Sequence, residues 1–562
     1  MKQGVNPILP LHEYIPDGEP HIFGDRIYLF GSHDREGGLR YCAEDNYVVW
    51  SAPLSDPADW RCENVIFESS QDPSYTEGEH LDLYAPDVVQ GNDGRYYLYY
   101  NPVSTAAGAG GHDAIHVAVC DTPAGIYEYL GAVRNPDGTV YNPYLDGDPA
   151  VINDDGVIRL YFGWSLSLTA AEAHARGKGM EGENRRTQAK AQTDTMEGCQ
   201  QADEASAAPK LPAPGDPLMN HKLSFLYQML FHRTPEQTDN LEYPLMGANT
   251  IELEDDMLTV KGKMKRIVAG QFDTPKDSDF FGHAFYEASS IRRINGTYYF
   301  IYSSENSNEL CYATSRCPDR EFRYGGTIIS NGDVGYHGRK PEDRLNQTAN
   351  DHGSLACVNG QWYIFHHRQT HRSTFSRQAC AEPVVFSENG SIAQAECTSM
   401  GLNGGPLKAE GAYPAAIACL LTNGHMPHIT NTRLEEDIPC ITNGADEAGN
   451  NESFITGIRE GTRIGYKYFN FHGSVMLTVQ VRGNAEGQLT VLCGPKDGDA
   501  AAIGEIQIHA ANHWTESRTQ ITAEGVLGLY LIYRGAGSLE FREFSLLKSD
   551  SKGVCNEKSD CT

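Results

Sequence analysis

A strand–turn–strand pattern that recurs five times constrains this chain more than any other feature. In the clearest copy, Glu287 opens a strand, a turn follows at Asn295 and Gly296, and a Tyr-rich strand returns over residues 297–304. The other four copies begin at polar residues, namely Asp17, Asp87, Asp148 and His352. Repeats of this length built from short antiparallel strands are typical of blades arranged around an axis. We therefore predict an all-β fold whose main part is a five-bladed β-propeller.

The spacing of the five leading residues supports a regular repeat with one insertion. They lie 70, 61, 139 and 65 positions apart, and the long interval contains a low-complexity block of 75 residues, 168–242. The block is rich in Ala, Gly, Glu, Gln and Lys without a sustained apolar face, which predicts a mobile insertion in the third blade. Within it, residues 223–231 are expected to form a short helix that packs on the propeller; binding of a partner is the alternative.

The leading residues of the five copies are candidates for one shared site. In a propeller the first strand of every blade lines the central channel, so its equivalent positions meet at one end. Four carboxyl groups and one imidazole would converge there, and carboxylates held together repel one another. Packing alone does not favour such a ring, so we predict an active site. For any single residue of the set, a polar cap before a strand is the alternative.

Domain boundaries follow from length and from a change in the strand pattern. A chain of 562 residues exceeds what one hydrophobic core usually supports. We predict a propeller over residues 1–425 and a β-sandwich (jelly-roll) over 430–548, with strands that include 475–481 and 528–533. The polar residues 549–562 are expected to be a flexible tail.

Charge and hydropathy exclude several classes of partner. A net charge of −30 argues against nucleic acid and anionic membranes and suits an enzyme acting on a neutral substrate. No run of 18 apolar residues occurs and the N-terminus lacks a signal-peptide core, so we predict a cytoplasmic protein. The 14 cysteines are scattered, which favours reduced thiols over a disulfide framework. A secreted chain that has lost its signal peptide is the alternative. The sequence gives no indication of oligomeric state.

Four short segments carry a family resemblance, namely Asp17–Pro20, Ala85–Asp87, Asp148–Pro149 and Glu287–Ser289. Together they resemble the acidic segments of glycoside hydrolase family 43 over residues 1 to about 425. The C-terminal part resembles a family 6 carbohydrate-binding module. Gly18 stands where the family usually has proline, so the first segment departs from the pattern. The seven-residue step from Asp17 to Gly24 favours Asp17 over Glu19 as its functional carboxylate.

The resemblance implies roles for the carboxyl groups. Family 43 enzymes invert the anomeric configuration, so one carboxylate activates water while a protonated carboxyl donates to the leaving oxygen. Asp17 is implied as the general base and Glu287 as the general acid. Asp148 is implied to raise the pKa of Glu287 and to orient it. Asp87 is expected to contact substrate or to support the site.

Four further residues are candidates for binding. His352 is implied to lie beside a structural calcium ion in the channel, although a metal-free channel histidine is the alternative, and no cofactor is expected for the chemistry. Arg377 is expected to reach the substrate or to form a structural salt bridge. His283 is expected to line the sugar pocket or to pack. Trp514, placed in a loop over 513–517, is expected to stack on a sugar or to seal the edge of the sandwich.

These expectations combine into one predicted function. The chain is expected to be an exo-glycosidase that releases α-L-arabinofuranosyl or β-D-xylosyl units from short plant-derived oligosaccharides, with the sugar class taken from the resemblance. A glycosidase for another sugar such as galactofuranose is one alternative. The others are a non-catalytic carbohydrate-binding propeller and an interaction scaffold acting through residues 168–242.

Overall fold

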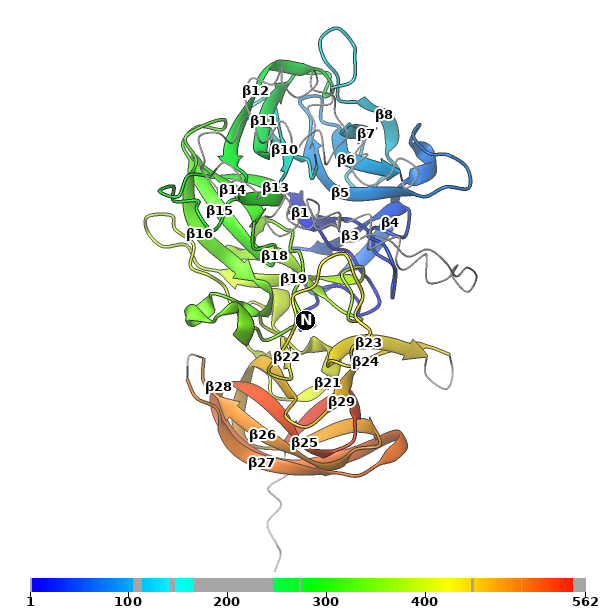
Figure 1. Ribbon diagram of the computed structural model, residues 1–562, viewed down its shortest axis with the longest axis vertical. Helices are drawn as coiled ribbons and strands as arrows, with labels where there is room; N and C mark the ends of the chain where they lie inside the picture. Colours follow the sequence, from blue (N-terminus) through cyan, green and yellow to red (C-terminus); the bar gives the residue numbers. More distant parts are fainter. Residues whose placement is uncertain are drawn as a thin grey trace, which may run out of the picture.

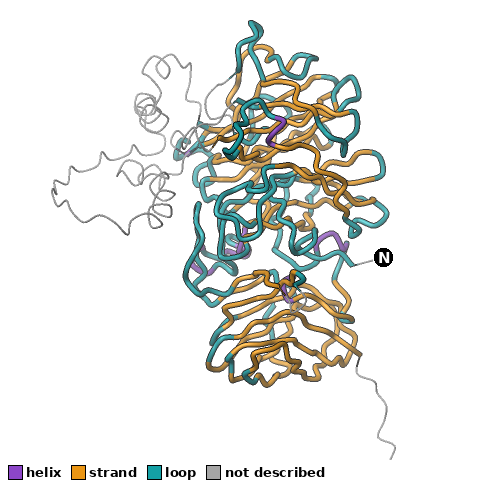
Figure 2. The backbone as a smooth tube through the Cα atoms, turned by 90° about the vertical axis from the view of Figure 1, so that its right-hand side faces the viewer, coloured by secondary structure: helices purple, strands orange, loops and turns teal. Residues whose placement is uncertain are grey.

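The computed structural model describes residues 3–104, 114–141, 147–165, 246–271, 274–445, 449–496 and 498–548. The predicted insertion at 168–242 and the tail at 549–562 lie outside these ranges. Figure 1 shows two stacked parts, a ring of small sheets and a curled C-terminal sheet below it. Strands dominate both parts, and within the described ranges helices occur only as short turns (Figure 2). The described ranges contain no helix with the length and apolar character needed to span a membrane.

Five antiparallel sheets form the blades of a propeller, each with its strands in chain order. Blade 1 contains β1 Glu19–Phe23, β2 Arg26–Phe30, β3 Asn46–Pro53 and β4 Arg61–Glu68. Blade 2 contains β5 Leu81–Gln90, β6 Tyr96–Ser104, β7 His116–Cys120 and β8 Glu128–Ala132. Blade 3 contains β9 Ala150–Asp154, β10 Val157–Trp164, β11 Gly247–Leu253 and β12 Val260–Ala269. Blade 4 contains β13 Phe285–Ile294, β14 Thr297–Ser304, β15 Glu309–Ser315 and β16 Arg323–Ser330. Blade 5 has three strands among the described residues, β17 Leu355–Val358, β18 Gln361–Gln369 and β19 Arg377–Val384.

The Tyr-rich second strands are explained by burial on both faces. Along β6, Leu98 and Tyr100 belong to a core shared with blade 1, whereas Tyr97 and Tyr99 belong to a core shared with blade 3. Successive side chains of a strand point to opposite faces, so an inter-blade strand must be apolar on both. Five such cores lie between neighbouring blades, and one of them joins blade 5 to blade 1. These cores close the ring, and the predicted five-bladed propeller is confirmed.

A ten-stranded sheet forms the C-terminal part around its own hydrophobic core. Its strands are β20 Leu407–Lys408, β21 Gly411–Pro414, β22 Leu420–Thr422, β23 Cys440–Ala445, β24 Asn451–Ile458, β25 Arg463–Gly483, β26 Glu486–Gly494, β27 Ala501–Ile508, β28 Ala511–Ala536 and β29 Leu539–Lys548. Short 3-10 turns connect elements in both parts: η1 Ser69–Gln71, η4 Asn331–Asp333, η5 Tyr336–Gly338, η6 Pro341–Asp343, η7 Gly401–Asn403 and η8 Ala415–Ile417.

The chain enters the C-terminal sheet earlier than the sequence indicates. Strands β20 and β22 pair with β25, and β21 pairs with β29. Residues 407–422, which we assigned to the propeller, therefore belong to the C-terminal sheet. Only two to four residues pair in each of these strands, so no run of alternating residues marks them in the sequence.

Buried polar contacts fix the C-terminal sheet to the propeller beside blade 5. Lys467 of β25 is only 2% exposed and pairs with Asp333 (3.1 Å) and Glu396 (2.8 Å). On another side, Asn443 of β23 donates to the hydroxyl of Tyr14 (2.7 Å). A buried charge without its partner costs about 3–5 kcal/mol, so these pairs resist separation of the two parts.

Candidate active site

Asp17 lies immediately before β1 in the left-handed backbone region, with a φ of 58°. Its side chain is buried, and Oδ1 accepts a hydrogen bond from Arg377 Nη1 (2.8 Å). Burial alone would raise the pKa of this carboxyl, but the positive charge of Arg377 outweighs burial and leaves the pKa below its ordinary value. Asp17 is therefore ionised at neutral pH, as a general base must be.

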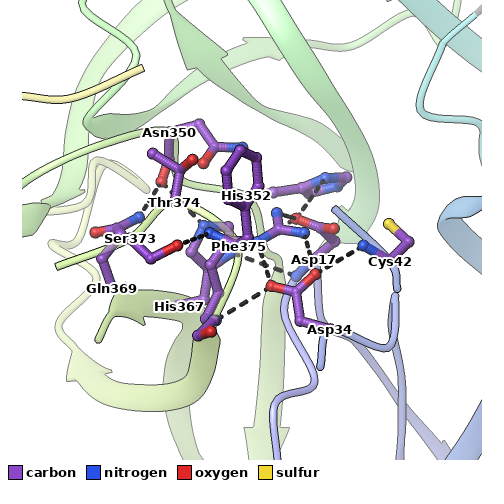
Figure 3. A network of polar contacts seen from close by, with 12 residues as sticks. Asp17, Asp34, Cys42, Asn350, His352, His367, Gln369, Ser373, Thr374 and Phe375 are labelled. Carbon is purple, nitrogen blue, oxygen red and sulfur yellow. Dashed lines mark hydrogen bonds and ion pairs between the residues drawn. The ribbon is translucent and has the colours of Figure 1, made fainter. Parts of the chain in front are cut away.

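Arg377 is held by two carboxylates that lie far from it in the sequence. Its Nε and Nη2 donate to the two oxygens of Asp34 at 2.8 and 3.0 Å, while Nη1 donates to Asp17. The guanidinium also lies over the ring of Tyr41, 4.8 Å from its centroid, and the side chain is only 2% exposed. Of the two roles expected for Arg377, the structure shows the ion pair, in a bidentate geometry that also orients Asp17. Figure 3 shows Asp17 and Asp34 facing one another in this network.

Glu287 is the third residue of β13, at an irregularity in its pairing with β14. Removal from bulk water is the largest cause that raises its pKa, to about 8, followed by the negative charges of Asp148 and Asp17. Arg377 and a hydrogen bond from Asn350 oppose the shift without cancelling it. Glu287 is therefore protonated at neutral pH, as a general acid must be.

Asp148 adopts the same left-handed conformation as Asp17, with a φ of 51°, and precedes β9. Its Oδ2 accepts the backbone N–H of Ala288 (2.8 Å), the residue that follows Glu287. This contact places a carboxylate beside the candidate acid and fixes the strand that carries it. Asp17, Asp148 and Glu287 thus meet at one end of the channel and influence one another electrostatically.

Substituting Asp148 by Asn is expected to move the alkaline limb of the pH–rate profile to lower pH. Since activity requires protonated Glu287, kcat/KM should fall above a pKa of about 8 in the wild type. Removing the Asp148 charge removes a cause that raises this pKa, so the limb should shift down by about one unit or more. The profile of kcat/KM against pH measures this shift of the alkaline limb. Asp155→Asn is the matched control, because Asp155 is 86% exposed in a turn of the same blade; an unmoved limb in Asp148→Asn would contradict the assignment.

Aromatic side chains surround the carboxyl groups. Tyr286 precedes Glu287, and its ring lies 6.3 Å from that of Trp164 at the end of β10. Tyr41 packs edge-on against Phe375, with ring centroids 4.8 Å apart. Tyr41 and Tyr286 both interact electrostatically with Glu287, so their rings lie beside that carboxyl group. Such rings bind the apolar faces of sugars and keep water from the reacting bond.

Asp87 does not meet the other carboxylates in the way its sequence spacing indicates. It is 0% exposed; Oδ1 contacts His21 Nε2 and accepts the N–H of Val88, both at 2.7 Å, and Oδ2 accepts the N–H of Val151 at 2.8 Å. Strand β5 begins six residues earlier, and its pairing with β6 is irregular between Tyr84 and Asp87, which moves Asp87 down the channel. Its carboxylate joins blades 1 to 3. Of the two roles that we expected for Asp87, contact with substrate and support of the site, this is the supporting role.

Glu19, the other candidate in the first segment, also lies in the channel. It is 1% exposed, and Oε2 accepts from Arg292 Nη2 (2.7 Å). Together with His21 and Asp87 it forms a compact group of possible metal ligands. Arg292 and backbone N–H groups already engage these carboxylates, and a guanidinium opposes a cation, so the group does not suit calcium.

His352 forms part of the site but not of a metal-ligand cluster. Its Nδ1 lies 3.8 Å from Asp17 Oδ1, the oxygen that Arg377 engages (Figure 3). Neither group of three possible ligands within the described ranges includes it. Calcium takes six to eight oxygen ligands, so the His352 imidazole alone is not evidence for that ion.

His283 and Trp514 lie in clusters of their own. His283 Nδ1 contacts Glu309 Oε1 (2.7 Å), and its ring stacks on Tyr324 at 5.0 Å. Trp514 lies within strand β28, not in the loop that we expected, and its Nε1 donates to Glu452 (2.8 Å). The guanidinium groups of Arg482 and Arg542 lie 4.3 and 4.9 Å from its ring. The loop prediction was wrong because β28 continues through polar residues.

The site contains residues that were not predicted from the sequence, namely the aromatic Tyr41, Trp164, Tyr286 and Phe375 and the polar Asp34, Tyr84, Asn350 and His367. Asp34 follows the first Tyr-containing strand pair, but no local pattern connects it to Arg377. Tyr84 lies within electrostatic reach of Arg377 and is nearer the start of β5 than Asp87 is. Asn350 precedes the leading residue of the fifth repeat by two positions, and this proximity is the one signal that could have indicated it.

A propeller whose channel holds an ionised carboxylate, a protonated carboxyl and a surround of aromatic rings defines the class: a glycoside hydrolase. The sequence profile described as glycosyl hydrolases family 43 matches residues 6–211 and 231–392. The chain therefore belongs to glycosyl hydrolase family 43. The match ends before the C-terminal sheet.

Individual relatives agree with this assignment. A xylosidase/arabinosidase of Thermoclostridium stercorarium is 36% identical over 554 residues, which cover 97% of this chain and 99% of that protein. Xylosidase/arabinosidase 43A of Humicola insolens is 26% identical over 366 residues, covering 63% and 88%. Among solved structures, a family 43 arabinoxylan arabinofuranohydrolase from Bacillus subtilis is 18% identical, with a TM-score of 0.42 and coverage of 97% of each chain.

Proposed function

We propose that this protein is an inverting exo-glycosidase that releases α-L-arabinofuranosyl or β-D-xylosyl units from short plant-derived oligosaccharides. The observation that carries the proposal is the contact of Arg377 with Asp17 and of Asp148 with the strand that carries Glu287, which favours opposite protonation of Asp17 and Glu287 at neutral pH. The sugar class is supported by the relatives, two of which are xylosidase/arabinosidases.

The chemistry follows from these two protonation states. Glu287 donates its proton to the glycosidic oxygen as the bond to the anomeric carbon breaks. Asp17 removes a proton from a water molecule, whose oxygen attacks the anomeric carbon from the opposite face. The turnover leaves Glu287 ionised and Asp17 protonated, and proton exchange with solvent restores both. Asp148 keeps the pKa of Glu287 high, and Arg377 keeps that of Asp17 low.

The test uses nitrophenyl α-L-arabinofuranoside, β-D-xyloside and β-D-galactofuranoside, with proton NMR of the first-formed sugar. We expect a pentoside to be hydrolysed at least about 100-fold faster than the galactofuranoside, in kcat/KM, and the β-xyloside to yield α-xylose first. Retention of configuration would make Asp17 a nucleophile and overturn the inverting mechanism. Absence of hydrolysis would favour the non-catalytic propeller, and preference for galactofuranoside would correct the sugar.

We also propose that the C-terminal sheet folds as a two-layer β-sandwich (jelly-roll) related to family 6 carbohydrate-binding modules. In support, β25 pairs with β28 and β29, and β28 continues to pair with β26, so two long strands turn the sheet around its core. Sugar stacking on Trp514 would have to accommodate the two arginines beside its ring. A calcium ion near His352 and the cytoplasmic location stay predictions.

A further inference from the structure

His367 contacts the backbone of Asp17 and the backbone of Asn350, whose side chain hydrogen bonds to Glu287. It lies in β18 and is 0% exposed. Its Nδ1 lies 3.3 Å from the backbone nitrogen of Asp17, and its Nε2 lies 2.9 Å from the carbonyl oxygen of Asn350. Figure 3 shows His367 between these two residues.

These two contacts determine the protonation of the ring. A backbone N–H can only donate, so Nδ1 must accept and carries no proton. A carbonyl oxygen can only accept, so Nε2 must carry the proton and donate. The imidazole is therefore neutral, in the Nε2–H tautomer. In agreement, burial and then the charge of Arg377 lower the pKa of His367 to about 4.

Each contact serves a position that requires support. Asp17 adopts the left-handed conformation, which a non-glycine residue keeps only when its surroundings hold it. The Nδ1 acceptor binds the N–H of that residue. On the other side, the Asn350 carbonyl also accepts from Gln369 Nε2 (2.7 Å), while the Asn350 side chain hydrogen bonds to Glu287.

We propose that His367 is a positioning residue that connects the general base to the general acid: its Nδ1 holds the backbone of Asp17, and its Nε2–H holds Asn350 against Glu287. This inference rests on the proposed function for the roles of the two carboxyl groups. The residue itself touches neither reacting atom. Its effect passes through the placement of Asp17 and through the Asn350–Glu287 hydrogen bond.

Two substitutions separate the two contacts. In His367→Asn, the side-chain oxygen can replace the Nδ1 acceptor, but nothing reaches Asn350. In His367→Gln, the amide N–H can replace the Nε2 donor, but the acceptor for Asp17 is lost. The control is His366→Asn on the same strand, because His366 is similarly buried but its Nδ1 lies against Asp351 Oδ2 (3.4 Å) instead of Asp17 or Asn350.

We expect both His367 variants to lower kcat by about 10- to 100-fold with KM changed less than threefold, since ground-state sugar contacts are kept. The alkaline limb should move to higher pH in His367→Asn, because the Asn350 hydrogen bond lowers the pKa of Glu287. Five other residues also face Glu287 and are unchanged in all three variants, namely Asp17, Asp148, Arg377, Tyr41 and Tyr286. His367→Gln should keep the wild-type limb.

His366→Asn should lower the melting temperature without moving either limb. The inference is overturned if His367→Asn and His367→Gln keep kcat within twofold. It is also overturned if both His367 variants lose activity only in proportion to a lower melting temperature, and if the alkaline limb of His367→Asn stays at its wild-type pH. That is the behaviour expected of His366→Asn. A wild type without glycosidase activity would instead refute the proposed function, so the two failures are distinguishable.

Discussion

Asp17→Asn is expected to lose hydrolysis of activated and unactivated glycosides alike, with kcat/KM at least about 10³-fold lower on both. Every turnover needs a base at the attacking water, and a better leaving group does not supply one. Asparagine has the same shape, and its side-chain oxygen can still accept from Arg377 Nη1, so the packing should be kept. The measurement is kcat/KM on a nitrophenyl pentoside and on a pentosyl disaccharide.

The control for Asp17→Asn is Asp93→Asn, since Asp93 is 44% exposed in a surface turn and pairs only with Arg95 and Tyr97. It should keep wild-type rates. If Asp17→Asn retained activity within tenfold of wild type, another group would have to activate water. Glu19 is a poor substitute, because it is buried and bound to Arg292.

The catalytic carboxyl groups could be predicted from the sequence because the fold repeats. Asp17, Asp148 and Glu287 each stand near the start of an inner strand, and the Tyr-rich partner strand marks that position. Symmetry then brings residues more than 100 positions apart to one end of the channel. Local pattern plus repetition indicated these three positions together with Asp87 and His352, and the family resemblance implied which of the five are catalytic.

The same reasoning misplaced Asp87, and the reason is local. Its distance from the Tyr-rich strand matches the other repeats, but β5 starts at Leu81 and has an irregular register before Asp87. Such irregularities add residues without changing the hydrophobic pattern, so spacing alone does not reveal them. The start of the inner strand is what reaches the site, and Tyr84, which lies nearer that start, is within electrostatic reach of Arg377.

Contacts between distant segments had no sequence signal. Asp34 and Arg377 are 343 residues apart, and their bidentate pair depends on blade 5 closing against blade 1. The contact of His367 with Asp17 depends on the same closure. The sequence therefore predicts which carboxyl groups react, whereas the groups that set their pKa values and orientation become visible only when the ring is assembled.

Glu287→Gln is expected to separate substrates by their leaving groups. On a pentosyl disaccharide, whose leaving oxygen needs a proton, kcat/KM should fall about 10³-fold or more. On a 2,4-dinitrophenyl pentoside, whose leaving group departs as a stable anion, the loss should stay below about tenfold. The ratio of the two kcat/KM values, measured in wild type and variant, tests this directly. Asp17→Asn is the internal contrast, because it should not change that ratio.

The pH profile gives Glu287→Gln a second, independent readout. In the wild type the alkaline limb reports ionisation of a carboxyl whose pKa is raised to about 8. Glutamine does not titrate, so on the activated substrate that limb should disappear while the acid limb remains. Equal losses on both substrates would mean that Glu287 does not protonate the leaving group. A persisting alkaline limb would assign the pKa near 8 to another group. Glu287 is the carboxyl whose pKa Asp148 and Asn350 influence, so the roles of acid and base would then have to be reassigned.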